Sequence, residues 1–134
     1  MPGNLSDYLE NRLLDHTLGT AAYAHPADVY LGLFTAAPTD AGGGTEVPTA
    51  GGTNYARQAV TFSAASGGAA TNSAEVAFPV AGASYGGSGV VAVGLFDSAS
   101  GGNLLWHGPT AATTAIGVND QYKIPAGDLD VSLD

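Results

Sequence analysis

The chain has 134 residues, enough for one domain that buries roughly two thirds of the surface its unfolded form exposes. Only 11% of the residues are charged, and 3 basic residues stand against 12 acidic ones, which gives a net charge of −9. Because affinity for nucleic acid depends on Lys and Arg contacts with phosphates, this balance argues against DNA, RNA or an anionic membrane as the main partner and favours packing against other protein.

The first ten residues, MPGNLSDYLE, lack the basic start and apolar run of a signal peptide. No window of the chain reaches the roughly 18 apolar residues of a membrane span. We therefore expect synthesis in a cytoplasm, unless another route exports the protein.

Residues 5–18 are predicted to form the one helix of the chain. Asn4 or Ser6 can cap its start, acidic side chains fill its first turns, and Gly19 can end it. At 100° per residue, one stripe of the helix is apolar and is expected to face the core: Leu5, Tyr8, Leu9 and Leu13.

Leu14 and Leu18 fall on the opposite side of this helix. A helix that is apolar on two sides is usually buried on two sides. We predict that the body covers one stripe and that a neighbouring subunit or a capping loop covers Leu14 and Leu18. A helix tucked fully under its own loops is the alternative.

All later segments are predicted to be strands and glycine-rich turns. The expected strands are residues 29–34, 55–62, 73–79, 91–96, 103–108, 121–125 and 128–134. Their inward side chains are predicted to be Val60 and Phe62, then Ala74, Val76 and Phe78, and finally Leu129, Val131 and Leu133. No helix lies between these strands, so a single domain over 1–134 is expected. Within it, residues 28–134 form an antiparallel β-sandwich or jelly-roll-like body of about seven or eight strands.

The hexapeptide VYLGLF at 29–34 returns as VAVGLF at 91–96. Glycine inside a strand usually marks a close approach to the backbone, and in each copy a phenylalanine follows two positions later on the same face. We predict structural packing roles for Gly32, Phe34, Gly94 and Phe96. The two copies reflect either an old duplication or equivalent places in two packed sheets, and we expect them to be facing walls of one apolar interior.

Residues with catalytic or metal-binding spacing are not found. The histidines His16, His25 and His107 lack the i, i+4 spacing and flanking Glu of a zinc enzyme helix, and the chain has no cysteine. There is no G-x-S-x-G elbow and no phosphate-binding loop with a lysine. We predict no enzyme activity, no metal and no cofactor.

Three aromatic or imidazole side chains are candidates for a partner interface: Trp106, His107 and Tyr85. Stacking of aromatic rings on a sugar would suit a glycan partner, whereas a large aromatic residue in a strand is more often part of a core or an interface. Together with Leu14 and Leu18, they complete the predicted interface residues.

Five stretches resemble, in order, a family of small tailed-bacteriophage virion proteins that are labelled tail fibre, minor structural or head decoration proteins. They are LENRLLDHTLGTAAY, VYLGLFTAAPTDAGGGTEV, YARQAVTFSAASGGAATNSAEVAFP, VGLFDSASGGNLLWHG and YKIPAGDLDVSLD. The resemblance runs from about residue 8 to the C-terminus and implies a virion protein without catalytic residues. GASYGGSGVV, residues 82–91, departs from the family pattern.

The resemblance and the composition together predict a non-enzymatic virion structural protein, in first place a capsid decoration or cement subunit. Its partners would be the major capsid protein or other virion proteins. A homo-oligomer is also expected, and a trimer would match the local threefold axes of a capsid. The alternative is a tail fibre or tail-associated module that contacts a host surface glycan.

Overall fold

The computed structural model describes residues 3–133, so the predicted domain limits at residues 1 and 134 lie outside it. The described chain is mainly β, with one helix and antiparallel strands, which confirms the predicted fold class. Its elements are β1 (Asn4–Leu5), α1 (Asp7–Thr17), β2 (Val29–Ala36), β3 (Thr45–Glu46), β4 (Gln58–Val60), β5 (Ala69–Thr71), β6 (Val76–Ala77), β7 (Val90–Phe96), β8 (Leu104–Thr114), β9 (Lys123–Ile124) and β10 (Asp130–Ser132).

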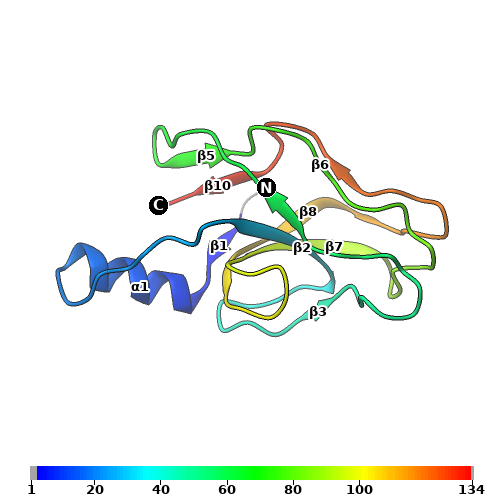
Figure 1. Ribbon diagram of the computed structural model, residues 1–134, viewed down its shortest axis with the longest axis horizontal. Helices are drawn as coiled ribbons and strands as arrows, with labels where there is room; N and C mark the ends of the chain where they lie inside the picture. The colour runs from blue at the N-terminus through cyan, green and yellow to red at the C-terminus, as the bar shows by residue number, and fades with distance from the viewer. Residues whose placement is uncertain (1–2, 134) are drawn as a thin grey trace.

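Six strands form the main sheet, in the order β1-β8-β7-β2-β3, and β4 also pairs with β2. β3 and β4 share the outer edge of β2, because Phe34 is opposite Glu46 while Leu31 is opposite Gln58. Two small sheets, β5 with β10 and β6 with β9, lie across the main sheet as a second, divided layer (Figure 1). The largest apolar cluster takes side chains from both layers, so the main core lies between them.

The two matching hexapeptides are neighbours in one sheet. β2 pairs with β7, and Gly32 is opposite Gly94, Leu31 opposite Leu95 and Leu33 opposite Val93. The expectation that the copies are facing walls in two packed sheets is therefore wrong. Both faces of these strands are apolar, as in central strands that are covered on both sides.

The two faces of this central pair bury different side chains. On one face, Leu31, Leu33, Val93 and Leu95 join the main core. On the other face, Phe34, Ala92 and Phe96 form a second apolar cluster, against which Val91 and Leu104 pack. The rings of Phe34 and Phe96 are stacked, with centroids 6.1 Å apart and planes 14° apart.

Each glycine of the pair lies beneath a phenylalanine ring of the other strand. A Cβ added at Gly32 would be 3.2 Å from Cε2 of Phe96, and one added at Gly94 would be 2.9 Å from Cε2 of Phe34. The absence of a side chain at these two positions therefore admits the stacked rings to the face of the sheet.

The predicted helix forms as α1, but over Asp7–Thr17 instead of 5–18, because Asn4 and Leu5 pair with β8 as strand β1. Its N-cap is Ser6, whose Oγ accepts a hydrogen bond from the backbone N–H of Leu9 at 3.2 Å, and Gly19 follows its end with φ +81°. On the predicted inner stripe, Leu5, Tyr8 and Leu9 pack against the main core, while Leu13 is half-buried.

Residues 7–28, which are α1 and the segment that leads back to β2, project from the β body as an arm (Figure 1). The returning segment is held by backbone hydrogen bonds to the helix end, such as the 2.8 Å bond from Thr20 N–H to the Asp15 carbonyl. Leu14 is 56% exposed and Leu18 is 74% exposed. Within residues 3–133, neither a capping loop nor the helix's own loops cover these side chains, so both of those expectations are wrong.

Several predicted strands are shorter than expected, and beside two of them the side chain of Asn72 makes bonds that a longer ladder would make. Asn72 is 2% exposed, and its amide nitrogen donates to the carbonyls of Ala74 and Pro125, at 2.8 and 3.0 Å. Its Oδ1 accepts from the backbone N–H groups of Gly127 and Leu129, at 3.0 and 2.9 Å. One buried amide thus connects the segment between β5 and β6 with the turn before β10.

The predicted inward alternation holds in part. Val60, Val76, Phe78 and Leu129 are buried, and Phe62 and Val131 are half-buried against the core. Ala74 and Leu133 are exposed, contrary to expectation, and both lie outside the strands β6 and β10. Among the described residues, no helix has the length and apolar character that crossing a membrane requires.

Candidate functional site

A groove of about 560 Å³ lies over the second apolar cluster. Its floor includes Phe34, Phe96 and Leu104. Its walls are the start of α1, the loop of residues 40–44 and the end of the β7–β8 turn at residues 102–104. The groove is thus the place where three segments that are distant in sequence meet above the paired glycines.

The walls are held by short-range contacts that the sequence specifies. Gly44 has φ +75°, and a Cβ there would lie 2.7 Å from the Ala36 carbonyl oxygen, so the loop can fold back on the end of β2 only with glycine at this position. In the β7–β8 turn, the carboxylate of Asp97 accepts from the backbone N–H and the side-chain amide of Asn103, at 2.7 and 2.8 Å.

The start of the helix is tied to the groove as well. The Ser6 hydroxyl donates to the Leu104 carbonyl, and the backbone N–H of Asp7 donates to the Asp40 carbonyl at 2.9 Å. The Asp40 carboxylate in turn contacts the imidazole of His107, with 2.8 Å between Oδ1 and Nε2. These bonds fix the arm's base to both the sheet and the loop of residues 40–44.

At the other end of the groove, Arg57 and Glu46 form a two-pronged ion pair. Arg57 Nε is 2.8 Å from Glu46 Oε1, and the second prong to Oε2 is also 2.8 Å. The Arg57 side chain is only 9% exposed, and its guanidinium carbon lies 3.4 Å from the ring centroid of Phe96. Its Nη1 donates to the carbonyls of Ser98 and Gly101, at 2.9 and 2.7 Å. Arg57 therefore joins β3, the approach to β4 and the β7–β8 turn.

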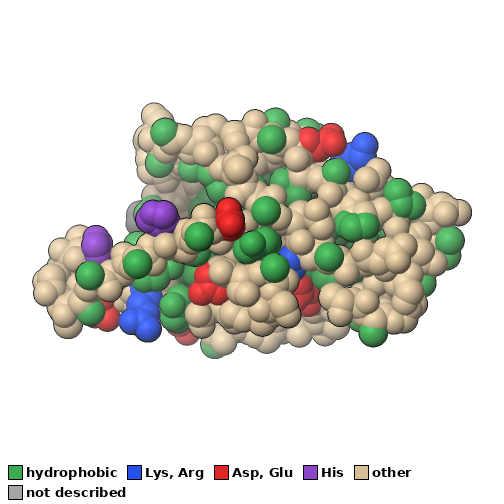
Figure 2. Space-filling view, in the orientation of Figure 1, with side chains coloured by type: hydrophobic (Ala, Val, Ile, Leu, Met, Phe, Trp, Pro, Cys, Tyr) green, Lys and Arg blue, Asp and Glu red, His purple; other side chains and the backbone are tan. Residues whose placement is uncertain are grey.

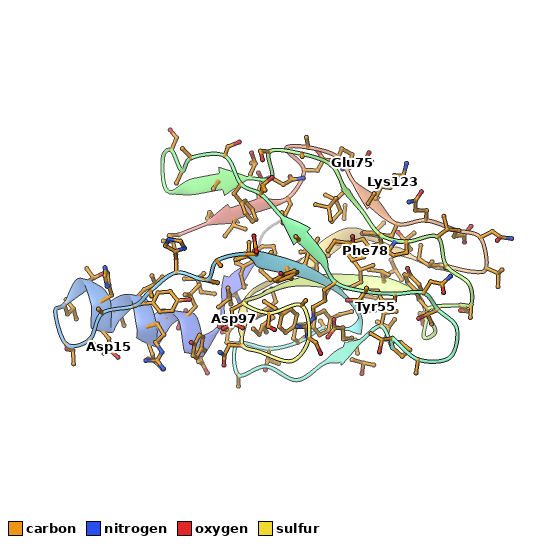
Figure 3. The ribbon with its side chains drawn as sticks, viewed as in Figure 1. Asp15, Tyr55, Glu75, Phe78, Asp97 and Lys123 are labelled. Atoms are coloured by element: carbon orange, nitrogen blue, oxygen red, sulfur yellow. The ribbon has the colours of Figure 1, made fainter. Side chains whose placement is uncertain are left out.

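Tyr55 is the third member of the cluster of Glu46 and Arg57. Its hydroxyl donates to Glu46 Oε1 at 2.7 Å and accepts the backbone N–H of Leu33 at 3.0 Å. Burial, followed by the neighbouring Glu46 carboxylate, raises the pKa of the Tyr55 hydroxyl far above its usual value. The phenol therefore stays neutral and keeps its donor role. Figure 3 shows Tyr55 beside Phe78, and the two rings are stacked with centroids 6.0 Å apart.

The polar groups of the groove are thus largely engaged with one another. Glu46 is held by Arg57 and Tyr55, and Asp40 is held by His107. Within residues 3–133, no group of three or more His, Cys, Asp or Glu side chains is placed to hold a metal ion. The groove therefore has an apolar floor, and most of the polar groups around it are held in place by hydrogen bonds and ion pairs.

The predicted interface residues do not come together in one surface. Tyr85 is 1% exposed and packs edge-on against Tyr55, and Trp106 is also 1% exposed, within the main core. The expected stacking surface for a glycan is therefore not formed, because both rings face inward. His107, next to Trp106 in β8, points to the opposite face and contacts Asp40. Leu14 and Leu18 lie apart from all three, on the arm.

Glu46 and Arg57 were missed in the sequence. A lone carboxylate in a turn-rich segment and a lone arginine eleven residues later carry no motif. One signal was present: Arg57 is one of only three basic residues, and it follows Tyr55 at the start of a predicted strand. In a chain so poor in cations, an arginine at a strand is a candidate for a buried ion pair.

Comparison with known protein families gives one match over almost the whole chain. The model of a family described as podophage GP4 fiber I protein gp80 matches residues 4–132. None of the curated protein sequences that were compared matches this chain. The matched range includes the arm, the groove and both hexapeptides.

Proposed function

The chain belongs to the family of podophage GP4 fiber I protein gp80, and we propose that it is a non-enzymatic component of a podophage tail fibre, held in place by protein–protein contacts. Its family makes it a phage virion structural protein, produced in the cytoplasm of the host bacterium. The family resemblance noted in the sequence is thereby confirmed at this level.

The observation that carries the proposal is the family match, and the surface supports it. Only 11% of the residues are charged, which leaves a surface of small and polar side chains that can pack closely against other protein. Two carboxylates at the groove are engaged in structural contacts, Glu46 with Arg57 and Asp40 with His107. Leu14 and Leu18 are exposed on the arm, which leaves them accessible for contact with another protein.

A capsid decoration subunit is the second candidate, and the net charge of −9 is the observation that favours it. An acidic subunit would be complementary to basic patches on a shell. The family name favours the fibre instead, since it describes a fiber protein.

Electron cryo-microscopy of purified virions, with an antibody fragment against this protein as a marker, tests the proposal. Fibre assignment requires marker density on the fibres at the tail. Density spread over the capsid would overturn the fibre assignment and establish the decoration role. A matched sample of virions that lack the gene controls for nonspecific binding of the antibody fragment.

A further inference from the structure

The groove over the second apolar cluster is large enough to admit part of another molecule. Its volume of about 560 Å³ lies within the range of about 300–1,000 Å³ that ligand pockets in proteins occupy. Its floor offers the apolar side chains of Phe34, Phe96 and Leu104, and carboxylates lie around this floor. The groove can therefore hold a few side chains of a partner protein.

The charges that line the groove are unbalanced. Three carboxylates, those of Asp7, Asp40 and Glu46, stand against one guanidinium, that of Arg57. Both prongs of Arg57 bind Glu46, so this pair is neutral as a whole. Asp40 contacts His107, but an imidazole that is counted as neutral at pH 7 leaves the negative charge of Asp40 in place. The groove therefore has a surplus of two negative charges.

Asp7 and Asp40 keep oxygen atoms free for a further partner. The Asp7 side chain is exposed at the start of α1 and makes no ion pair or hydrogen bond within residues 3–133. Oδ1 of Asp40 contacts His107, whereas its Oδ2 has no partner in that range. The two residues are neighbours, since the backbone N–H of Asp7 donates to the Asp40 carbonyl at 2.9 Å. A cation that enters the groove here can reach both carboxylates.

The start of α1, which also lines the groove, offers little to an anion. The backbone N–H of Asp7 is bonded to the Asp40 carbonyl, and that of Leu9 is bonded to Ser6 Oγ at 3.2 Å. These bonds use donors that would otherwise attract an anion to a helix start. With two carboxylates beside them, the groove favours a cation.

The groove already holds one guanidinium, which shows how a second can bind. The guanidinium carbon of Arg57 is 3.4 Å from the ring centroid of Phe96, while its nitrogens bind Glu46 at 2.8 Å. A guanidinium thus lies between a phenyl ring and a carboxylate. Phe34, whose ring is stacked with that of Phe96, lines the same groove as Asp40. The aliphatic stem of an incoming arginine can pack on this floor while its head binds the carboxylates.

We propose that the groove binds an arginine side chain on a basic segment of another virion protein. The partner is a different protein and not a second copy, because a net charge of −9 makes copies repel each other, whereas it attracts a basic segment. Figure 2 shows acidic side chains spread over the face that is drawn, with few cationic ones among them. The inference rests on the proposed structural role and adds the chemistry of one partner.

A peptide titration followed by NMR tests the binding. The probe is the pentapeptide Gly-Arg-Ala-Arg-Gly with blocked ends, and Gly-Gln-Ala-Gln-Gly is the control of equal length without charge. At about pH 7.5, where histidine is ordinarily neutral, the arginine peptide is expected to shift the backbone amide signals of Gly42, Gly102 and Asn103. The shifts should saturate with a Kd of about 1 mM or below. Equal shifts with both peptides would overturn the proposal, and so would the absence of shifts at the groove.

Asparagine substitutions locate the binding. Asp7→Asn/Asp40→Asn removes both negative charges, while the amide oxygen at position 40 can still accept the His107 N–H. We expect this variant to raise the Kd of the arginine peptide about tenfold. Asp28→Asn/Asp128→Asn is the matched control, because it removes two exposed carboxylates outside the groove, and its Kd should stay within about twofold of the natural value. Equal weakening in the two double variants would contradict a site in the groove.

The salt dependence of binding gives a second readout that needs no variant. Raising the sodium chloride concentration from about 0.05 M to about 0.5 M is expected to raise the Kd of the arginine peptide several-fold, because salt screens partly exposed charges. A Kd that does not change with salt would overturn the role of the two carboxylates. Circular dichroism of each variant checks that the fold is kept.

The outcomes also separate this inference from the fibre assignment. Fibre density on the virion without binding of the arginine peptide would overturn the arginine site and leave the fibre assignment standing. Capsid density together with peptide binding in the groove would do the reverse.

Discussion

Gly32 and Gly94 are directly opposite each other in the central strands β2 and β7, and each lies beneath the phenylalanine ring of the other strand's hexapeptide. The repeat in the sequence is therefore a pair of neighbouring strands. Its two glycines leave room for the stacked rings of Phe34 and Phe96 on one face, while the other face fills the main core. The groove lies over these rings.

A methyl group at either glycine should destabilise the fold. At Gly94, the new Cβ would lie 2.8 Å from Leu104 Cδ1 and 2.9 Å from the Phe34 ring, and at Gly32 it would lie 2.9 Å from the Glu46 carboxylate. We expect Gly94→Ala and Gly32→Ala each to lower the free energy of unfolding by about 1–3 kcal/mol, measured by urea denaturation. Gly117→Ala is the control, since its Cβ would meet only Asp120 Oδ2 at an ordinary 3.6 Å. Equal losses in all three variants would contradict a packing role.

Removal of the Arg57 charge should leave the Glu46 carboxylate without its partner. Because Glu46 is 27% exposed, water offsets part of the loss, and we expect Arg57→Met to lower the free energy of unfolding by about 2–4 kcal/mol. Arg12→Met is the matched control: Arg12 is exposed on the arm, its guanidinium lies 5.3 Å from the Tyr8 ring centroid, and we expect a change of less than about 1 kcal/mol. Chemical denaturation of the two variants side by side measures both. If Arg57→Met lowers the free energy of unfolding by no more than Arg12→Met does, the buried pair adds nothing measurable to stability.

Stability should fall at alkaline pH, partly through Tyr55. Burial and Glu46 raise the pKa of this hydroxyl in the folded protein, whereas in the unfolded chain it ionises near pH 10. The unfolded state therefore loses a proton that the folded state keeps, so stability is full below about pH 10 and declines above it. Burial also raises the pKa of Tyr85 and Tyr122, which act in the same direction.

Tyr55→Phe should make this decline shallower by about 1.4 kcal/mol per pH unit above pH 10. The slope is the readout, because the variant also loses two hydrogen bonds at every pH. Urea denaturation at several pH values between 9 and about 11.5 gives the slope for each protein. An unchanged slope would mean that Tyr55 ionises equally in the folded and unfolded states.

A charge at Asn72 should be poorly tolerated. In Asn72→Asp, a carboxylate oxygen would replace the nitrogen that donates to the carbonyls of Ala74 and Pro125, and acceptors would face acceptors in a buried place. We expect a loss of about 2–4 kcal/mol in the free energy of unfolding. Asn11→Asp, exposed on α1, is the control and should stay within about 0.5 kcal/mol. Thermal denaturation of both variants gives the comparison.

Trp106 provides a direct optical test of the core, because it is the single tryptophan of the chain. At 1% exposure, its fluorescence should be blue-shifted in the folded protein relative to the unfolded one, and added saccharides should leave it unchanged. Trp106→Ala should lower the free energy of unfolding by about 3–5 kcal/mol through the cavity it leaves. Native emission at the wavelength of the unfolded chain would contradict the buried position.

Much of the fold followed from local pattern. The cap, acidic first turn and terminal glycine defined α1, and alternating apolar residues defined β2 and β7, because these signals act over a few neighbouring residues. The glycine-rich turns ruled out further helices and indicated antiparallel pairing. Composition argued against nucleic acid as the main partner, since three basic residues offer few contacts with phosphates.

Only the tertiary structure decided how these pieces meet. The register that places Gly32 opposite Gly94, and the inward direction of Trp106 and Tyr85, depend on which strands become neighbours. The pair of Glu46 and Arg57 likewise joins residues from different strands at the groove. Contacts of this kind arise from packing between segments that are distant in the chain, and a strand's alternation shows that it has two faces without showing what covers each one.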